Sequence, residues 1–446
     1  MTNSALWLSQ IQFFLSLGFL SLFLVIELGL AWVLLFFKLC AHRSGQSAWT
    51  TAYRFWVRVF ALAFILTFAA SMPVLIQFGS LWPSLMDKIG EIAGPLLAAA
   101  IVTTFIFKSC FLGAMLFGQS RLSDRMHTLV VFMVALGVTL AAGWMVVLLS
   151  WMQTPDGANM IDGQYHVVSW TGVLLNPSAG WYAALFAVSA ALSVAFLMLG
   201  VTVGQTLRRP LDESERLVFK MALVVAMTAV LLQGAAGWGA AGVIARHQPA
   251  KAAATAGYWH SGVQPGLVLF GWPDAASQRN LFAWEWRHAG GRWLGRDAKG
   301  QLQGLDKFSE KSPPVALVFW SFRLTVMVGL LMLAASWLTY FRVRKKEFDP
   351  GMLSVRWRRF LRLMMFSGWV GCLTGLAYSL FGLYPYAVNQ TVTLSEIASA
   401  TDWTVLLGAG MAYLLFYAAL MLGFLQLLRH IARYGVVPVA RRRGRA

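Results

Sequence analysis

The segment 11–38, IQFFLSLGFLSLFLVIELGLAWVLLFFK, contains one acidic residue, Glu27, and one basic residue, at its end. A helix needs about 20 mainly apolar residues to cross a bilayer, so this segment is long enough to span a membrane. Eight similar segments follow it. The nine predicted spans are 11–38, 54–78, 93–117, 127–151, 180–204, 218–246, 315–341, 358–384 and 402–428. We therefore expect an all-α polytopic membrane protein whose residues 1–446 form a single domain.

The composition supports this class. Of the 446 residues, 58% are hydrophobic and 12% are charged, whereas soluble domains carry about 25% charged residues. The net charge of +18 lies in short basic runs beside the predicted spans, as in membrane proteins, so we expect membrane lipid and no nucleic acid as a partner. The three cysteines, Cys40, Cys110 and Cys372, have no CxxC spacing, and we expect neither disulfides nor a metal site.

The loops alternate in charge, and this alternation predicts the orientation. Loops one, three, five and seven carry Lys and Arg, whereas 152–179 and 385–401 carry none. Because cytoplasmic loops are enriched in Lys and Arg, the N-terminus is predicted outside and the C-terminus in the cytoplasm. The segment 429–446 is then a basic cytoplasmic tail. The long segment 247–313 is external, and its turn motifs and tryptophans predict an ordered cap on the outer face.

Short motifs recur in the order found in one known family. They are LSQIQF at 8–13, IQFGSLW at 76–82, LFGQSRL at 116–122, VALG at 134–137, WMQTP at 151–155, LLNP at 174–177, QPAK at 248–251, LFGWPD at 269–274 and FWSFR at 319–323. Together with the nine spans and the long loop after span six, they make the chain resemble subunit I of the cytochrome bd quinol oxidases. The resemblance implies a bacterial cytoplasmic (inner) membrane, a second membrane subunit, haem cofactors and quinol oxidation at the loop 247–313.

The resemblance also implies where the family's haem ligands fall. Two histidines, a methionine and a glutamate, a further glutamate used for haem contact and proton delivery, and the arginine of a GRQPW motif are all replaced. The corresponding residues are Leu20, Leu185, Thr325, Ala100, Lys108 and Leu383. Haem iron needs a His, Met, thiolate or Tyr ligand, so we expect no haem in the membrane core.

The histidines do not restore these ligands. All seven, at positions 42, 127, 166, 247, 260, 288 and 430, lie in loops or at span ends. A haem held at the outer surface by His247 or His260 is an alternative, and His127 is expected to be a structural hydrogen-bonding residue.

The resemblance assigns the lysine of QPAK and a glutamate five residues later to the quinol head group. Lys251 is present, but the glutamate position is Ala256. Because quinol oxidation needs proton acceptors, the motif is interpreted as loop architecture that docks on span six. Binding of a quinone by Gln248, Lys251, Trp259 and Arg323 is the alternative.

Two charges lie deep in predicted spans. Glu27 and Lys108 are each about fifteen residues from the outer end of their span, which at about 1.5 Å per residue places them at a similar depth. Buried membrane charges are usually paired or functional. We expect an ion pair; the alternatives are that each charge reaches water separately or contacts a partner subunit.

Three functions follow from these observations. The first is a haem-poor or haem-free, structural or accessory subunit of a bd-type respiratory complex, with no catalytic residues of its own. Its partner would be a subunit II-like chain or a ligand-bearing subunit I paralogue, packed on GAAGWGAAG at 234–242 or GAGMAY at 408–413, unless these glycines serve contacts inside the bundle. The second is an active quinol:oxygen oxidoreductase with unconventional ligands. The third is a repurposed quinone-binding, lipid-binding or ion-conducting module.

Overall fold

The computed structural model describes residues 3–262, 265–286, 290–308 and 311–434. Within these residues nine helical segments are long and apolar enough to cross a membrane, which confirms the predicted class. Six of them are single helices: α1 (Asn3–Ser44), α2 (Ser47–Ser80), α5 (Asp124–Gln153), α8 (Glu213–His247), α10 (Val315–Val343) and α14 (Trp403–Tyr434). The remaining three are interrupted, or preceded by a short helix. Residues 435–446 of the predicted basic tail lie outside the described part.

The third span has a break at its centre. It consists of α3 (Leu85–Thr103), a π-helical turn (Thr104–Ser109) and α4 (Cys110–Phe117). The turn lies against Gly137 of α5, where an added Cβ would come 2.3 Å from Cβ of Phe107. A residue without a side chain is therefore required for this approach. The turn also carries Lys108 into the bundle.

Two other spans, the fifth and the eighth, also consist of more than one helix. The fifth consists of α6 (Trp170–Leu174) and α7 (Ala179–Thr206). The eighth consists of α11 (Val355–Leu363), a 3₁₀ turn (Met364–Phe366) and α12 (Ser367–Phe381). Every span is helical because a helix satisfies its own backbone hydrogen bonds, which lipid cannot do.

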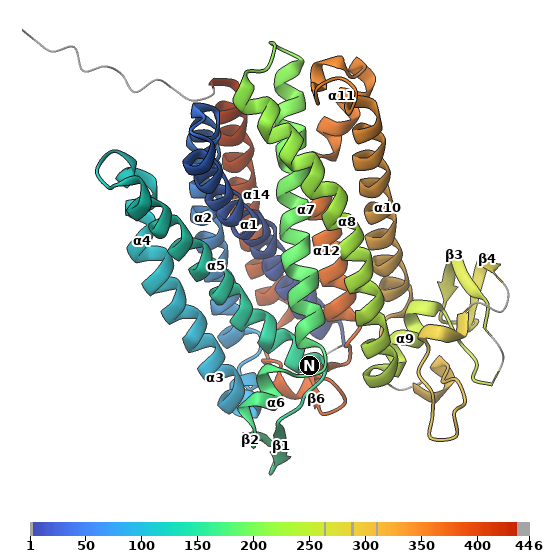
Figure 1. Ribbon diagram of the computed structural model, residues 1–446. Helices are drawn as coiled ribbons and strands as arrows, with labels where there is room; N and C mark the ends of the chain where they lie inside the picture. The colour runs from blue at the N-terminus through green and yellow to red at the C-terminus, as the bar shows by residue number, and fades with distance from the viewer. Residues whose placement is uncertain (1–2, 263–264, 287–289, 309–310, 435–446) are drawn as a thin grey trace, which may run out of the picture.

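Helix α1 is the centre of the bundle. It packs against α2, α5, α7, α12 and α14 (Figure 1). Phe23, Val25, Leu30 and Phe37 of α1 are fully buried in the large apolar core that joins these helices. The most apolar stretches of the third and ninth spans are only 11% buried, so both helices present most of their surface outward.

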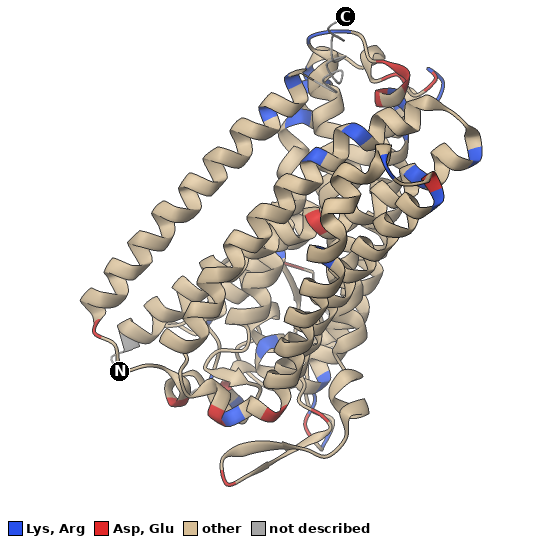
Figure 2. Ribbon diagram, turned by 90° about the vertical axis from the view of Figure 1, so that its left-hand side faces the viewer, with Lys and Arg blue, Asp and Glu red and all other residues tan. Residues whose placement is uncertain are grey.

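The charged residues gather at the two ends of the bundle (Figure 2). The N-terminus lies at one end, and Lys and Arg predominate at the other, where α14 ends (Figure 2). We call these the N-terminal end and the C-terminal end. The connections at the N-terminal end form the hairpin β1 (Ala158–Ile161)–β2 (Gln164–Val167), the hairpin β5 (Tyr386–Val388)–β6 (Val392–Thr393) and the short helix α13 (Leu394–Ile397).

The segment 247–313 is largely structured. It contains α9 (Pro249–Ala256), β3 (Leu267–Asp274) and β4 (Arg279–Trp286), and the last two pair as an antiparallel hairpin. The hairpin stands to one side of the bundle beside α10 and does not cover its end (Figure 1). The expected cap over the outer face is therefore a lateral structure. The reason is local: Arg323 of α10 donates hydrogen bonds to the β3 backbone and holds it at the flank of the helix.

Candidate functional site

The QPAK segment packs on α8, the span expected from the sequence, and also forms a buried polar contact with the end of α5. Pro249 begins α9 because proline cannot donate the backbone hydrogen bond that would extend α8. Nε2 of Gln248 donates to the carbonyl oxygen of Gln153 at 3.0 Å, and Nζ of Lys251 donates to Oε1 of Gln153 at 3.2 Å. Helix α9 therefore docks on the end of α5 as well as on α8. We call Gln153, Gln248 and Lys251 the lysine clamp.

Lys251 is buried without an acidic partner. Its Nζ lies 4.6 Å from the centre of the Tyr378 ring, and the structure describes no ion pair for it. The stem of Lys251 packs on Gly382, where an added Cβ would come 2.6 Å from Cε of the lysine. Loss of hydration by burial lowers the pKa of Lys251 to about 7. The amine is therefore poised to lose its charge near neutral pH while still donating to Gln153.

A cleft of about 640 Å³ opens beside the lysine clamp. Its lining includes Lys251, Lys307 and Lys311, together with amide and tyrosine side chains, and none of the described lining residues is acidic. Leu383, where the resemblance expects an arginine, also lines it. The cleft can accept a polar or anionic group, but the part of its lining that the structure describes offers no carboxylate base.

Trp259 and Arg323 bind opposite ends of the hairpin, Trp259 near its turn and Arg323 at its base. Nε1 of Trp259 donates to Oδ1 of Asn280 at 3.0 Å. The guanidinium of Arg323 donates to the carbonyl oxygens of Val268 at 2.6 Å and Thr255 at 2.8 Å, and it lies over the Phe319 ring. Of the four residues expected around a quinone, Gln248 and Lys251 are thus together, whereas Trp259 and Arg323 bind protein groups of the loop.

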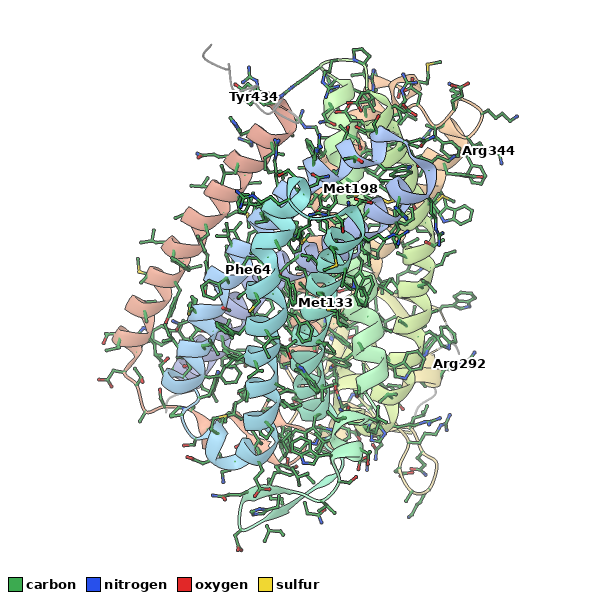
Figure 3. The ribbon with its side chains drawn as sticks, turned by 60° about the vertical axis from the view of Figure 1, so that its left-hand side comes forward. Phe64, Met133, Met198, Arg292, Arg344 and Tyr434 are labelled. Atoms are coloured by element: carbon green, nitrogen blue, oxygen red, sulfur yellow. The ribbon has the colours of Figure 1, made fainter. Side chains whose placement is uncertain are left out.

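The two deep charges lie next to each other. Nζ of Lys108 is 2.8 Å from Oε1 of Glu27, and both side chains are buried. The direction of approach does not meet hydrogen-bond geometry, and Oε2 of Glu27 has no hydrogen-bond partner among the described residues. The Phe64 ring centre lies 5.1 Å from the ammonium, and Phe64 lies about midway along the bundle (Figure 3). The pair therefore occupies the core, at the break in the third span.

The positions at which the resemblance expects haem ligands hold side chains that do not suit haem iron. Leu20 packs against the apolar core and Leu185 is half-buried, and neither has a donor atom. The hydroxyl of Thr325 is 2.7 Å from that of Thr374 on α12 and donates to the carbonyl oxygen of Ser321. Ala100 is buried. No iron ligand is thus offered from these positions.

The histidines lie mainly at the surface. His42, His247, His260 and His430 are exposed at the ends of the bundle. His166 contacts Glu91 at 2.8 Å. His127 is buried, and its Nε2 donates to the carbonyl oxygen of Met115 at 3.1 Å, a structural contact. His288 lies outside the described residues. In the described part of the chain, no three His, Cys, Asp or Glu side chains gather closely enough to hold a metal ion.

Comparison with known proteins identifies the family. The profile described as cytochrome bd terminal oxidase subunit I matches residues 8–436. The chain belongs to this family. Cytochrome bd ubiquinol oxidase subunit 1 of Bacillus subtilis is 25% identical over 374 residues, which are 81% of this chain and 78% of the relative. Cytochrome bd-II ubiquinol oxidase subunit 1 of Escherichia coli is 28% identical over 279 residues, which are 62% of this chain and 54% of the relative.

The fold agrees with this family assignment. The structure of bd oxidase from Geobacillus thermodenitrificans superposes with a TM-score of 0.87 at 18% identity, covering 96% of this chain and 98% of that one. The chain is therefore a polytopic membrane protein of the cytochrome bd subunit I family, and the resemblance derived from its motifs is confirmed.

Three residues that shape these sites were not singled out from the sequence. Gln153 anchors the lysine clamp, Tyr378 faces Lys251, and Gly137 admits the π-helical turn. Gln153 and Gly137 lie inside the motifs WMQTP and VALG, which were the available signals. Tyr378 lies in an apolar span and had no such signal.

Proposed function

We propose that this cytochrome bd subunit I-like chain is a haem-poor or haem-free membrane subunit with a structural or accessory role in a bd-type complex. The observation that carries the proposal is the chemistry of the former ligand positions. Leu20 and Leu185 offer no donor atom, and the Thr325 hydroxyl is occupied by Thr374. Iron in haem requires a stronger ligand than these residues provide.

The buried ion pair adds a second line of support. In the family, the position of Lys108 is a glutamate that serves haem contact and proton delivery. Here a lysine is neutralised by Glu27 across 2.8 Å in the core. The ion pair links α1 to the third span. The replacement of glutamate by lysine also removes the carboxylate that the family uses at this position.

A partner chain is supported by unfilled small-residue surfaces. Among the described residues, a Cβ added at Gly234, Gly237 or Gly242 of α8, or at Gly408 of α14, would meet no atom within 4 Å. Gly239 differs, because Trp181 packs directly on it. Most of these glycines thus face away from the bundle, where a second helical subunit can approach closely. We propose a subunit II-like chain or a ligand-bearing subunit I paralogue as the partner.

The proposed setting is the bacterial cytoplasmic membrane. The family assignment and the gathering of Lys and Arg at the C-terminal end support an external N-terminus and a cytoplasmic C-terminus.

Purification in mild detergent tests the accessory role. We expect one multi-span protein to co-purify at near-equal stoichiometry. The double variant Gly234→Leu/Gly237→Leu should weaken this association, whereas Gly113→Leu, on the outward surface of α4, should not. A functional monomer with no enriched membrane protein would contradict the proposal. If both variants still bind the partner, only the proposed location of the interface is rejected.

A second candidate function is quinone binding in the cleft beside Lys251, favoured by its volume of about 640 Å³. Titration with a short-chain ubiquinone tests it. Saturable binding that is lost in Lys251→Met but kept in Lys220→Met would support this function. Equal binding to all three proteins would exclude it.

A further inference from the structure

The β3–β4 hairpin carries an unusual number of exposed aromatic side chains. Phe282 is 90% exposed and Trp284 is 70% exposed. Phe270, Trp272 and Trp286 are also more than half exposed. An exposed apolar patch of this kind in a protein surface marks a region that contacts a partner or a membrane.

The depth of the hairpin follows from its attachment to α10. That helix has 29 residues, Val315–Val343, and is about 43 Å long, whereas the hydrocarbon core is about 30 Å thick. If the helix is centred in the bilayer, the hydrocarbon boundary lies about 7 Å from its first residue. Arg323 lies about 12 Å along the helix and donates a hydrogen bond to the carbonyl oxygen of Val268 at 2.6 Å. The start of β3 therefore lies within about 5 Å of the membrane boundary, on its hydrocarbon side.

The aromatic patch continues into the lipid-facing surface of α10. The Phe270 ring packs on Trp320 with 5.1 Å between ring centres. Leu324, Met327 and Leu331 are exposed and follow Trp320 at helical spacing, so they lie on the same face. In a spanning helix, such a face contacts acyl chains. The hairpin extends this apolar surface sideways in the plane of the membrane, beside α10 (Figure 1).

The polar groups of the same region are arranged as at a membrane interface. The turn of the hairpin, Asp274–Arg279, is polar. Nearby on α8, Trp238 is exposed, and its ring centre lies 4.9 Å from that of Trp293. The guanidinium of Arg292 lies 5.0 Å from the centre of the Trp238 ring. Arg292 lies toward the N-terminal end of the bundle (Figure 3). Trp is enriched where rings meet lipid headgroups, and Arg at this level can reach their phosphates.

We propose that the β3–β4 hairpin is a membrane-interface anchor whose aromatic side chains insert at the boundary between headgroups and acyl chains. The ligand is the lipid surface itself. The anchor braces the loop that carries the lysine clamp, because Arg323 joins β3 to the carbonyl oxygen of Thr255 in α9.

Spin-label depth measurement tests the anchor. Cys40, Cys110 and Cys372 are replaced by Ala in the full chain, and a nitroxide is attached to a single cysteine at Phe282, Trp284 or, as a control, Ala298. The control residue is exposed in the loop after the hairpin. The proteins are placed in nanodiscs of phosphatidylcholine and phosphatidylglycerol, and accessibility to oxygen and to a water-soluble nickel chelate is compared.

We expect labels at positions 282 and 284 to be more accessible to oxygen than to nickel, and the label at position 298 to show the reverse. Because Phe282 is almost fully exposed, its replacement removes few contacts and should leave folding intact. High nickel accessibility at both hairpin positions would overturn the proposal. Immobilised labels that neither reagent reaches would also overturn it and assign the patch to a protein partner.

Discussion

Lys108 and Lys251, two of the buried lysines in this molecule, are stabilised in different ways. Lys108 lies midway along the bundle, 2.8 Å from the carboxylate of Glu27. Lys251 lies near the N-terminal end against the amide of Gln153 and the ring of Tyr378, and no carboxylate of the described residues pairs with it. A buried ammonium can keep its charge if an anion compensates for lost hydration, and otherwise it tends to become neutral. The deep lysine is therefore held as half of an ion pair, and the clamp lysine as a hydrogen-bond donor.

The largest expected effect comes from removing one member of the ion pair. Glu27→Leu and Lys108→Leu should each lower the free energy of unfolding by about 3–5 kcal/mol, because each leaves an uncompensated charge in the core. The double variant Glu27→Leu/Lys108→Leu should lose much less. Thermal unfolding of the wild type, the two single variants and the double variant in one detergent measures these losses of stability. Additive losses in the double variant would show that the two charges are not coupled.

The second prediction concerns the pH dependence of the clamp. Burial lowers the pKa of Lys251 to about 7, below its unfolded value of 10.5. Between these values the unfolded chain binds the extra proton, so stability should rise with pH by about 1.4 kcal/mol per unit from this group. Below pH 7 both states are protonated, and the full cost of burying the charge is present.

Lys251→Met should remove this contribution. The difference in stability between the wild type and the variant should change by about 2 kcal/mol from pH 7 to pH 9, because the folded lysine is still partly protonated at pH 7. Thermal unfolding of both proteins across this range provides the measurement, and Lys220→Met serves as a surface control. A constant difference across the range would mean that Lys251 keeps its charge, and the contrast with Lys108 would then fail.

The third prediction concerns the backbone that positions Lys108. In Gly137→Ala the new Cβ would lie 2.3 Å from Cβ of Phe107, so the π-helical turn must move. We expect a loss of about 1–3 kcal/mol from overpacking. Gly143→Ala, also in α5, is the matched control, because its Cβ would meet no described atom within 4 Å. Similar melting temperatures for the two variants would argue against a tight fit at Gly137.

Much of the fold could be predicted, because each span is a continuous apolar run of sequence and the family motifs lie at the ends of the spans. The π-helical break in the third span could not be predicted, since residues 104–109 contain no proline or glycine that would mark an interruption. The deep charges could be recognised individually from their cost in lipid. The clamp was harder: Lys251 was visible in QPAK, but its partners Gln153 and Tyr378 lie about 100 residues or more away in sequence, so only the fold brings them together.

The measurement that most directly tests the central claim is the haem content of the chain itself. The purified protein, separated from co-purifying subunits, is assayed as its pyridine haemochrome and compared with its molar concentration. Because Leu20, Leu185 and Thr325 offer no suitable iron ligand, we predict no stoichiometric b- or d-type haem. One or more haems per chain would contradict the account and favour an active oxidase with ligands outside the family positions.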